Sequence, residues 1–172
     1  MWSRAGVPGP WSPAKAGRCT LLLLVLAVVL PACYSSVDLK QALQVTDVST
    51  GWYDAGIVDG KNKLVPSVTF KLTKSPDVRL SSASLNVVFR KDTGEEHDDV
   101  FVQRVEFVAN NETAPIVVRG TTGYTGDPPQ SRADMLKNSQ FRDMDAEIFV
   151  RQSSSQWIPL HKVRIVRQLL TR

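Results

Sequence analysis

The chain has 172 residues, with 21 lysines and arginines against 17 aspartates and glutamates, which gives a formal net charge of +4. Three of the basic residues and none of the acidic ones fall in residues 1–32, so the remainder carries 18 basic against 17 acidic residues. A nearly neutral remainder lacks the basic face that nucleic-acid binding needs. Two cysteines, Cys19 and Cys33, exclude a disulfide-rich scaffold.

The first recognisable element is an apolar run of 11 residues, Thr20 to Leu30, preceded by Arg4, Lys15 and Arg18. A bilayer span needs about 20 apolar residues, so this run is too short to cross a membrane as a helix. A basic segment followed by a short apolar run is typical of a secretory signal peptide.

The tetrapeptide that ends this run, Leu30-Pro31-Ala32-Cys33, resembles the lipobox of bacterial lipoproteins. The resemblance implies that residues 1–32 are removed, that Cys33 is lipidated, and that 33–38 form a tether to a domain at 39–172. Tyr34 after the cysteine, rather than Asp, fits outer-membrane sorting in the proteins that this chain resembles. The alternative is an ordinary cleaved signal followed by a cysteine by chance.

The mature segment alternates apolar and polar residues with a period of two, which predicts half-buried β-strands. Short strands separated by turn residues predict an all-β fold, an immunoglobulin-like antiparallel β-sandwich of about seven strands. One short helix, Ser131 to Asn138, is expected in a crossover loop because Ser131 suits an N-cap. The strands are expected near 43–48, 67–72, 84–90, 104–107, 115–119, 146–151 and 162–165.

Turn residues mark the breaks between these strands. Compact turns with positive φ are expected at 58–62 and 91–94, where Asp and Gly stand together, and a hairpin tip at 152–155. The stretch Val68 to Gly94 resembles bacterial immunoglobulin-like envelope modules of the FxLYD type, in which two alternating strands flank a polar link. The FxLYD tetrapeptide itself is absent. The resemblance implies a sandwich scaffold and no activity.

Chemically suggestive motifs have simpler structural explanations. Asp92-Thr93-Gly94 has the composition of an aspartic-protease tripeptide, but its charged neighbours favour a solvated hairpin turn. The cluster Glu95 to Asp99 lacks the spacing of a calcium loop and is expected to be a hydrated acidic turn. His97 and His161 are too few for a zinc site. We therefore expect no catalytic, metal or cofactor site.

Three aromatic residues are the candidate partner contacts. Trp52 and Tyr53 lie in the glycine-bounded segment 51–56, which is expected to be a loop, and Tyr124 lies in the long connection 119–140. Aromatic rings on loops offer large contact areas at low entropic cost. Two alternatives stay open: Trp52 as a core tryptophan, and 119–140 as a Greek-key crossover with Met135 and Leu136 in the core.

These features together predict a non-enzymatic, lipid-anchored binding or assembly module of the bacterial cell envelope, facing the periplasm or the cell surface. We expect it to be held on the membrane through Cys33 and to bind an envelope protein rather than nucleic acid. Two other functions remain open. One is a lipoprotein hydrolase, which would need carboxylates such as Asp92, Glu95, Asp98 and Asp127 to converge in a pocket. The other is a small-ligand carrier with an apolar cavity between its sheets.

Overall fold

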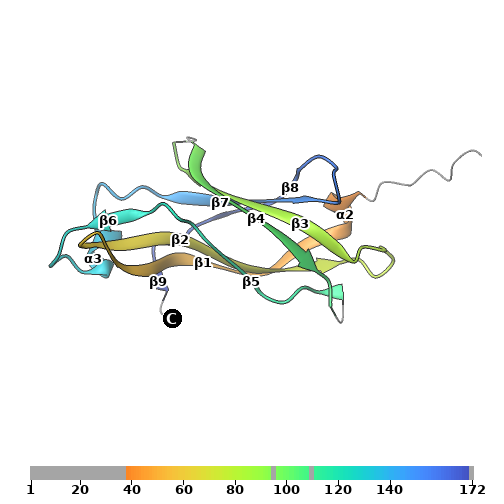
Figure 1. Ribbon diagram of the computed structural model, residues 1–172, viewed down its shortest axis with the longest axis horizontal. Coiled ribbons are helices and arrows are strands. Elements are labelled where there is room, and N and C mark those ends of the chain that lie inside the picture. The colour runs from red at the N-terminus through yellow and green to blue at the C-terminus, as the bar shows by residue number, and fades with distance from the viewer. Residues whose placement is uncertain (1–37, 94–95, 109–110, 171–172) are drawn as a thin grey trace, which may run out of the picture. The chain divides into compact units, whose positions relative to one another are not determined.

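Two β-sheets packed face to face make up most of the described part of the chain (Figure 1). The computed structural model describes residues 38–93, 96–108 and 111–170. The predicted signal segment, Cys33 and nearly all of the tether lie outside the described residues, as do the side chains of 96–102. No helix in the described part of the chain is long and apolar enough to cross a membrane.

The first sheet contains five strands, with β5, β2, β1 and β9 side by side and β6 pairing with the first residues of β2. All its contacts are antiparallel except the pairing of β9 with β1. Its strands are β1 (Leu43–Val58), β2 (Lys61–Lys74), β5 (Ile116–Arg119), β6 (Tyr124–Gly126) and β9 (Leu169–Leu170).

The second sheet has four antiparallel strands in the order β4, β3, β7, β8. They are β3 (Ser82–Lys91), β4 (Glu96–Glu106), β7 (Met144–Arg151) and β8 (Ile158–Arg164). Two short helices complete the described part, α2 (Leu39–Ala42) before β1 and α3 (Arg132–Lys137) between β6 and β7. The strand orders match those of an immunoglobulin-like sandwich, with A, B and E in one sheet and C′, C, F and G in the other.

The predicted all-β sandwich is thus confirmed, with nine strands in the described residues rather than about seven. The two additional strands, β6 and β9, have three and two residues, too few to produce an alternating pattern. Ser131 caps α3 at its N-terminus, and Asn138 follows its last residue, as predicted. The turn after β1 has positive φ at Asp59 and Gly60 (52° and 77°), also as predicted.

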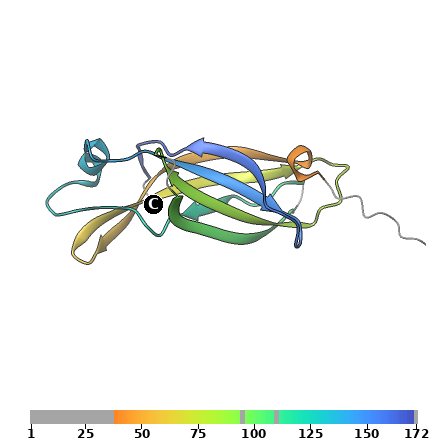
Figure 2. The same ribbon diagram turned by 90° about the horizontal axis from the view of Figure 1, so that it is seen from above.

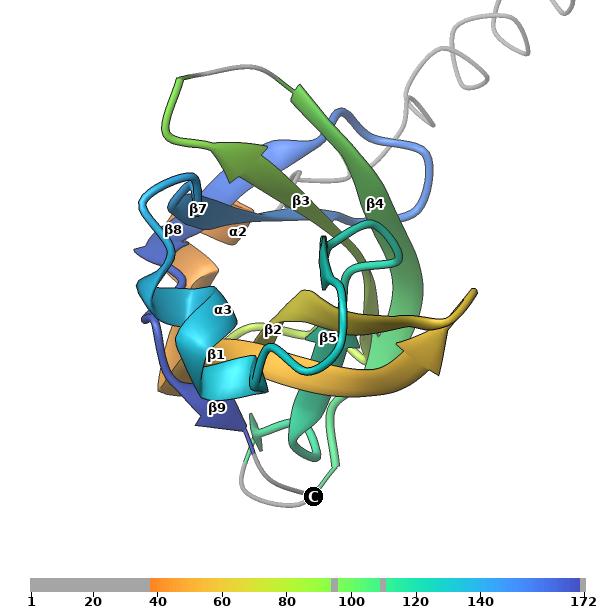
Figure 3. The ribbon, with the colours of Figure 1, turned by 90° about the vertical axis from the view of Figure 1, so that its left-hand side faces the viewer.

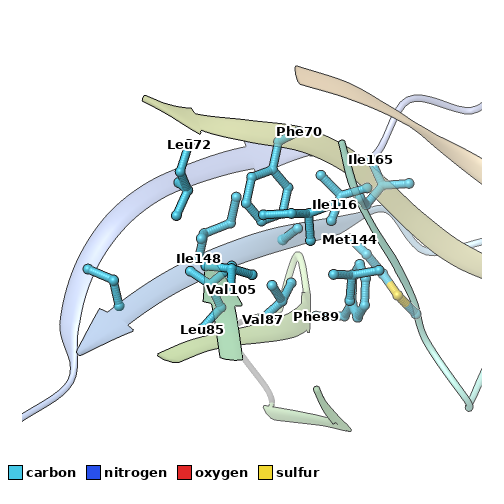
Figure 4. Close-up of a cluster of buried hydrophobic side chains, with 14 of the residues drawn as sticks. Phe70, Leu72, Leu85, Val87, Phe89, Val105, Ile116, Met144, Ile148 and Ile165 are labelled. Atoms are coloured by element: carbon cyan, nitrogen blue, oxygen red, sulfur yellow. The ribbon is translucent and has the colours of Figure 1, made fainter. Parts of the chain in front are cut away.

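The core lies between the sheets and is built mainly from alternate residues of facing strands (Figure 4), with Leu39 of α2 and Leu136 of α3 packed against them. In β7 the burial pattern alternates without exception, with Ala146, Ile148 and Val150 buried. Phe70 from the first sheet and Phe89 from the second are both fully buried. Burying each of these side chains contributes roughly 1.5–3 kcal/mol, so the apolar alternation is the main determinant of the sandwich.

One sequence prediction about β1 was wrong. Residues 51–56 do not form a loop but continue β1, which spans 16 residues from Leu43 to Val58. A register shift between Asp54 and Gly56 leaves Ala55 without a partner on β2, and Gly56 itself has a positive φ of 84°. The flanking glycines that suggested a loop are accommodated inside the strand, because its partner β2 continues alongside it.

The sandwich has two distinct ends (Figures 1 and 2). The α2 end carries α2, the link between β2 and β3, and the turn between β7 and β8. The opposite end, here called the hairpin end, carries the turn between β1 and β2, with β6 and α3 beside it. The described chain therefore begins at one end, and its longest hairpin reaches the other.

Candidate functional site: the hairpin end

The tip of the β1–β2 hairpin exposes two large apolar side chains. Ile57 is 65% exposed and Val58 is 39% exposed, immediately before the Asp59-Gly60 turn. Figure 3, which looks onto this end, shows the β1–β2 hairpin projecting to the side away from α3. Apolar side chains at the tip of an ordered hairpin provide a compact surface for contact with another molecule.

The base of this hairpin is held by polar contacts with α3. Asp54 accepts a hydrogen bond from the backbone N–H of Gly56 at 2.8 Å. Its other oxygen, Oδ2, lies 3.1 Å from Nε of Arg132 in α3. The exposed tip is therefore attached to the body of the domain.

The connection from Arg119 to Gln140 folds back along β2. Asn62 donates through Nδ2 to the carbonyl oxygen of Gln130 at 2.7 Å, and Lys63 donates through Nζ to that of Thr121 at 2.7 Å. Met135 and Leu136 in α3 are buried in the core. These contacts confirm the crossover interpretation of this segment.

Trp52 is a core residue rather than a surface contact. Its side chain is 0% exposed and packs edge-on against Phe141, with ring centroids 4.6 Å apart, and against Tyr124 at 5.5 Å. The indole Nε1 has no hydrogen-bond acceptor among the described residues. The structure thus supports the alternative left open above for Trp52.

Tyr124 is half-buried and fixed by its hydroxyl group. Its ring stacks on Phe141 with centroids 4.2 Å apart, and its hydroxyl oxygen accepts a hydrogen bond from the backbone N–H of Arg142 at 2.5 Å. Burial raises the pKa of this phenol above its ordinary value of 10.0, with a smaller opposing effect from the Arg142 backbone. Tyr124 therefore ties the crossover to the residues before β7.

Tyr53 faces outward, since it follows the buried Trp52 in β1. It is half-buried, and the guanidinium carbon of Arg119 lies 3.6 Å from its ring centroid, in a cation–π contact. Of the three predicted contact residues, Tyr53 and Tyr124 retain some exposed surface. Sequence reasoning missed Ile57 and Val58, although an apolar pair beside an Asp-Gly turn was a usable signal.

A groove lies beside α3 at the same end. It measures about 490 Å³ and is lined by Ala133, Leu136, Lys137, Arg167 and Leu169. Its lining offers apolar surface and two cations but no carboxylate, histidine or cysteine. Such a lining suits binding better than acid–base chemistry.

The carboxylates considered for hydrolysis are only partly described. Asp92 is exposed in the turn after β3, and Asp127 is exposed and paired with Lys61 at 3.5 Å. Glu95 and the side chains of Asp98 and His97 lie outside the described residues, and His161 is exposed on β8. Within the described part, no three His, Cys, Asp or Glu side chains are grouped to hold a metal ion.

Comparison with known proteins identifies no family for this chain. No protein-family model and no curated protein matches it. Among solved structures, it is similar to a chain described as the X-ray structure of Northeast Structural Genomics Consortium target SoR45. That similarity has a TM-score of 0.32 and 15% identity, and covers 74% of this chain and 88% of the other. A likeness at this level carries no functional argument.

Proposed function

We propose that this protein is a non-enzymatic, lipid-anchored module of the bacterial cell envelope that binds or assembles with another envelope protein. The lipobox-like tetrapeptide ending at Cys33 supports the anchor, because it follows a signal-type apolar run directly. The localisation is the periplasmic or outer surface of a membrane, with the outer membrane favoured. Two or more acyl chains on Cys33 would hold the domain stably without a spanning helix.

The observation that carries the binding role is the opposite placement of the chain entry and the hairpin tip (Figure 1). The described chain enters the sandwich at α2, which begins six residues after Cys33, whereas Ile57 and Val58 are exposed at the far end of β1. A strand of 16 residues spans about 50 Å. An anchor at Cys33 would therefore leave the hairpin tip free to project away from the membrane.

The chemistry of the tip fits a protein partner. Two apolar side chains at a tip fastened through Asp54 and Arg132 can bury apolar surface at low entropic cost. Tyr53 with Arg119 adds an aromatic and a cationic group, which are enriched in protein interfaces.

Site-specific photo-crosslinking in the native host tests this proposal. A photoreactive residue replaces Ile57 in one strain and Ser49, an exposed residue of β1 remote from the hairpin tip, in the matched control strain. We expect a defined crosslinked protein from position 57 that is absent or weaker from position 49. Equal capture from both positions, or none from position 57 in a membrane-bound and folded protein, would overturn the assignment of the hairpin end.

A further inference from the structure

The outer face of the second sheet is divided into two parts with different charge pairing. In the part near the start of β7, cations and carboxylates alternate and pair. Arg90 contacts Glu147 at 2.8 Å, and Lys162 contacts Glu147 at 3.1 Å and Asp145 at 3.3 Å. The pairing continues with Arg164 and Asp145 at 3.2 Å, and Arg167 and Asp143 at 2.6 Å.

The other part carries two arginines without a described carboxylate partner. Ser84 pairs across the sheet with Arg104 on β4 and with Arg151 on β7, so the three residues form one row. The guanidinium of Arg151 lies over the ring of Trp157, 4.4 Å from its centroid, which extends the row. We call these four residues the arginine row. They face outward, because their neighbours Leu85, Val105 and Val150 are buried.

The arginine row makes few polar contacts with the described residues. Arg104 donates to the hydroxyl of Ser82 at 2.9 Å, and Nε of Arg151 is buried without a hydrogen-bond partner. Neither arginine forms an ion pair with a carboxylate among the described side chains. The terminal N–H groups of each guanidinium can therefore pair with a carboxylate from another molecule.

The edge of the sheet beside Arg104 adds an apolar feature. Arg104 borders a groove of about 320 Å³ on the open side of the sandwich, between β4 and β5. The apolar part of its lining includes Val105, Val108, Ile116 and Val117, and the exposed carboxylate of Glu106, two residues after Arg104, also borders it. A partner peptide that places a carboxylate on Arg104 can place a neighbouring apolar side chain in this groove. A flat membrane surface cannot enter the groove, so the groove favours a peptide over a membrane.

From this charge complementarity we propose that the arginine row binds an extended acidic peptide segment of a partner protein. Carboxylates of the segment pair with Arg104 on β4 and Arg151 on β7. Strand β3 lies between these two strands, so their backbones are about 10 Å apart. Trp157 supplies an aromatic surface beside Arg151, and an apolar residue of the segment occupies the groove at β4. This site is separate from the hairpin end and does not depend on lipidation of Cys33.

A binding titration with matched charge variants tests the proposal. The full chain, in neutral detergent micelles, is titrated against a fluorescent peptide of alternating Glu and Val, with a Gln and Val peptide as the uncharged control. The variants are Arg104→Gln and Arg151→Gln. Arg164→Gln removes the same charge from the ion-paired part of the same face and serves as the control.

We expect each variant in the arginine row to weaken binding of the acidic peptide about tenfold, the loss of one charged hydrogen-bonded pair. Arg164→Gln should change it less than about twofold, and the uncharged peptide should not bind. Equal losses in all three variants would show general electrostatic attraction and overturn the proposal. Absence of peptide binding in neutral micelles would also overturn the proposal. It would do so even if the same arginines bind micelles that contain phosphatidylglycerol.

Discussion

The backbone at Gly123 crosses β2 so closely that a β-carbon there would lie 2.0 Å from the carbonyl oxygen of Leu64. This contact seats β6 against β2 and places Tyr124, the next residue, over Phe141. A backbone oxygen within a paired strand has little freedom to move away. The close approach therefore requires glycine at this position.

Gly123→Ala should accordingly destabilise the domain strongly. Overpacking typically costs roughly 1–3 kcal/mol, and we expect a loss at the upper end of that range or beyond. Gly60→Ala is the matched control, since its φ of +77° strains any other residue but a β-carbon meets nothing within 4 Å. Strain alone should cost about 1–2 kcal/mol. Urea unfolding of both variants checks this, and an equal or smaller loss for Gly123→Ala would contradict the contact.

Truncation of the buried phenylalanines tests the core. Phe70→Ala and Phe89→Ala should each lower the free energy of unfolding by roughly 3–5 kcal/mol, because each leaves a cavity between the sheets. Val117→Ala, at a side chain that is 50% exposed on the edge strand β5, should cost less than about 1 kcal/mol. Chemical denaturation measures all three. A loss below about 1 kcal/mol for either phenylalanine would be inconsistent with its strand assignment.

Much of this fold is predictable from the alternation of apolar and polar residues. Burial alternates along the whole of β7 and along β3 as far as Val87, so the predicted positions of both strands were close to the observed ones. The same reasoning failed at Trp52. Its place in the core depends on Phe141 and Tyr124, which are remote in sequence, and not on the glycines beside it.

The candidate site was less predictable than the fold. Exposure of Ile57 and Val58 depends on how far the β1–β2 hairpin extends, which is a property of the assembled sandwich. The arginine row likewise requires the cross-strand register of β4, β3 and β7, which no local pattern specifies. Tyr124 was predicted as a partner contact, and in the structure its hydroxyl oxygen accepts a hydrogen bond from the backbone N–H of Arg142.

Tyr124→Phe should remove the hydrogen bond between the Tyr124 hydroxyl and the backbone of Arg142, and it should change how the free energy of unfolding depends on alkaline pH. Loss of the hydrogen bond to Arg142 should cost about 1 kcal/mol at neutral pH. Because burial raises the pKa of the Tyr124 phenol above 10.0, the folded state favours its neutral form. That stabilisation is complete below pH 10.0 and is lost as pH rises through the raised pKa. Unfolding of both proteins across this range should show a steeper alkaline loss for the wild type, whereas parallel profiles would refute the prediction.

Glu147 should contribute to acid sensitivity. Burial disfavours its charge, but hydrogen bonds from Arg90 and Lys162 outweigh burial and lower the pKa of the carboxyl below 4.5. The folded state therefore gains stability that is present above pH 4.5 and disappears as pH falls through the lowered pKa. Glu147→Gln should flatten this acid dependence, while Glu106→Gln, at an exposed carboxylate, serves as the control. Thermal unfolding between pH 6 and pH 2 makes the comparison. If stability falls with pH equally steeply in the wild type and in Glu147→Gln, the pairing of Glu147 with Arg90 and Lys162 is contradicted.

The lipid anchor at Cys33 is the central claim, and metabolic labelling tests it most directly. Cells expressing the wild type or Cys33→Ser are grown with an alkyne fatty acid, and the purified proteins are examined for label and for membrane association. We predict label on the wild-type protein at Cys33. The serine variant should be unlabelled and released from membranes, yet show the same cooperative unfolding transition. An unlabelled wild-type protein, or a serine variant that keeps its label and its membrane association, would contradict the account.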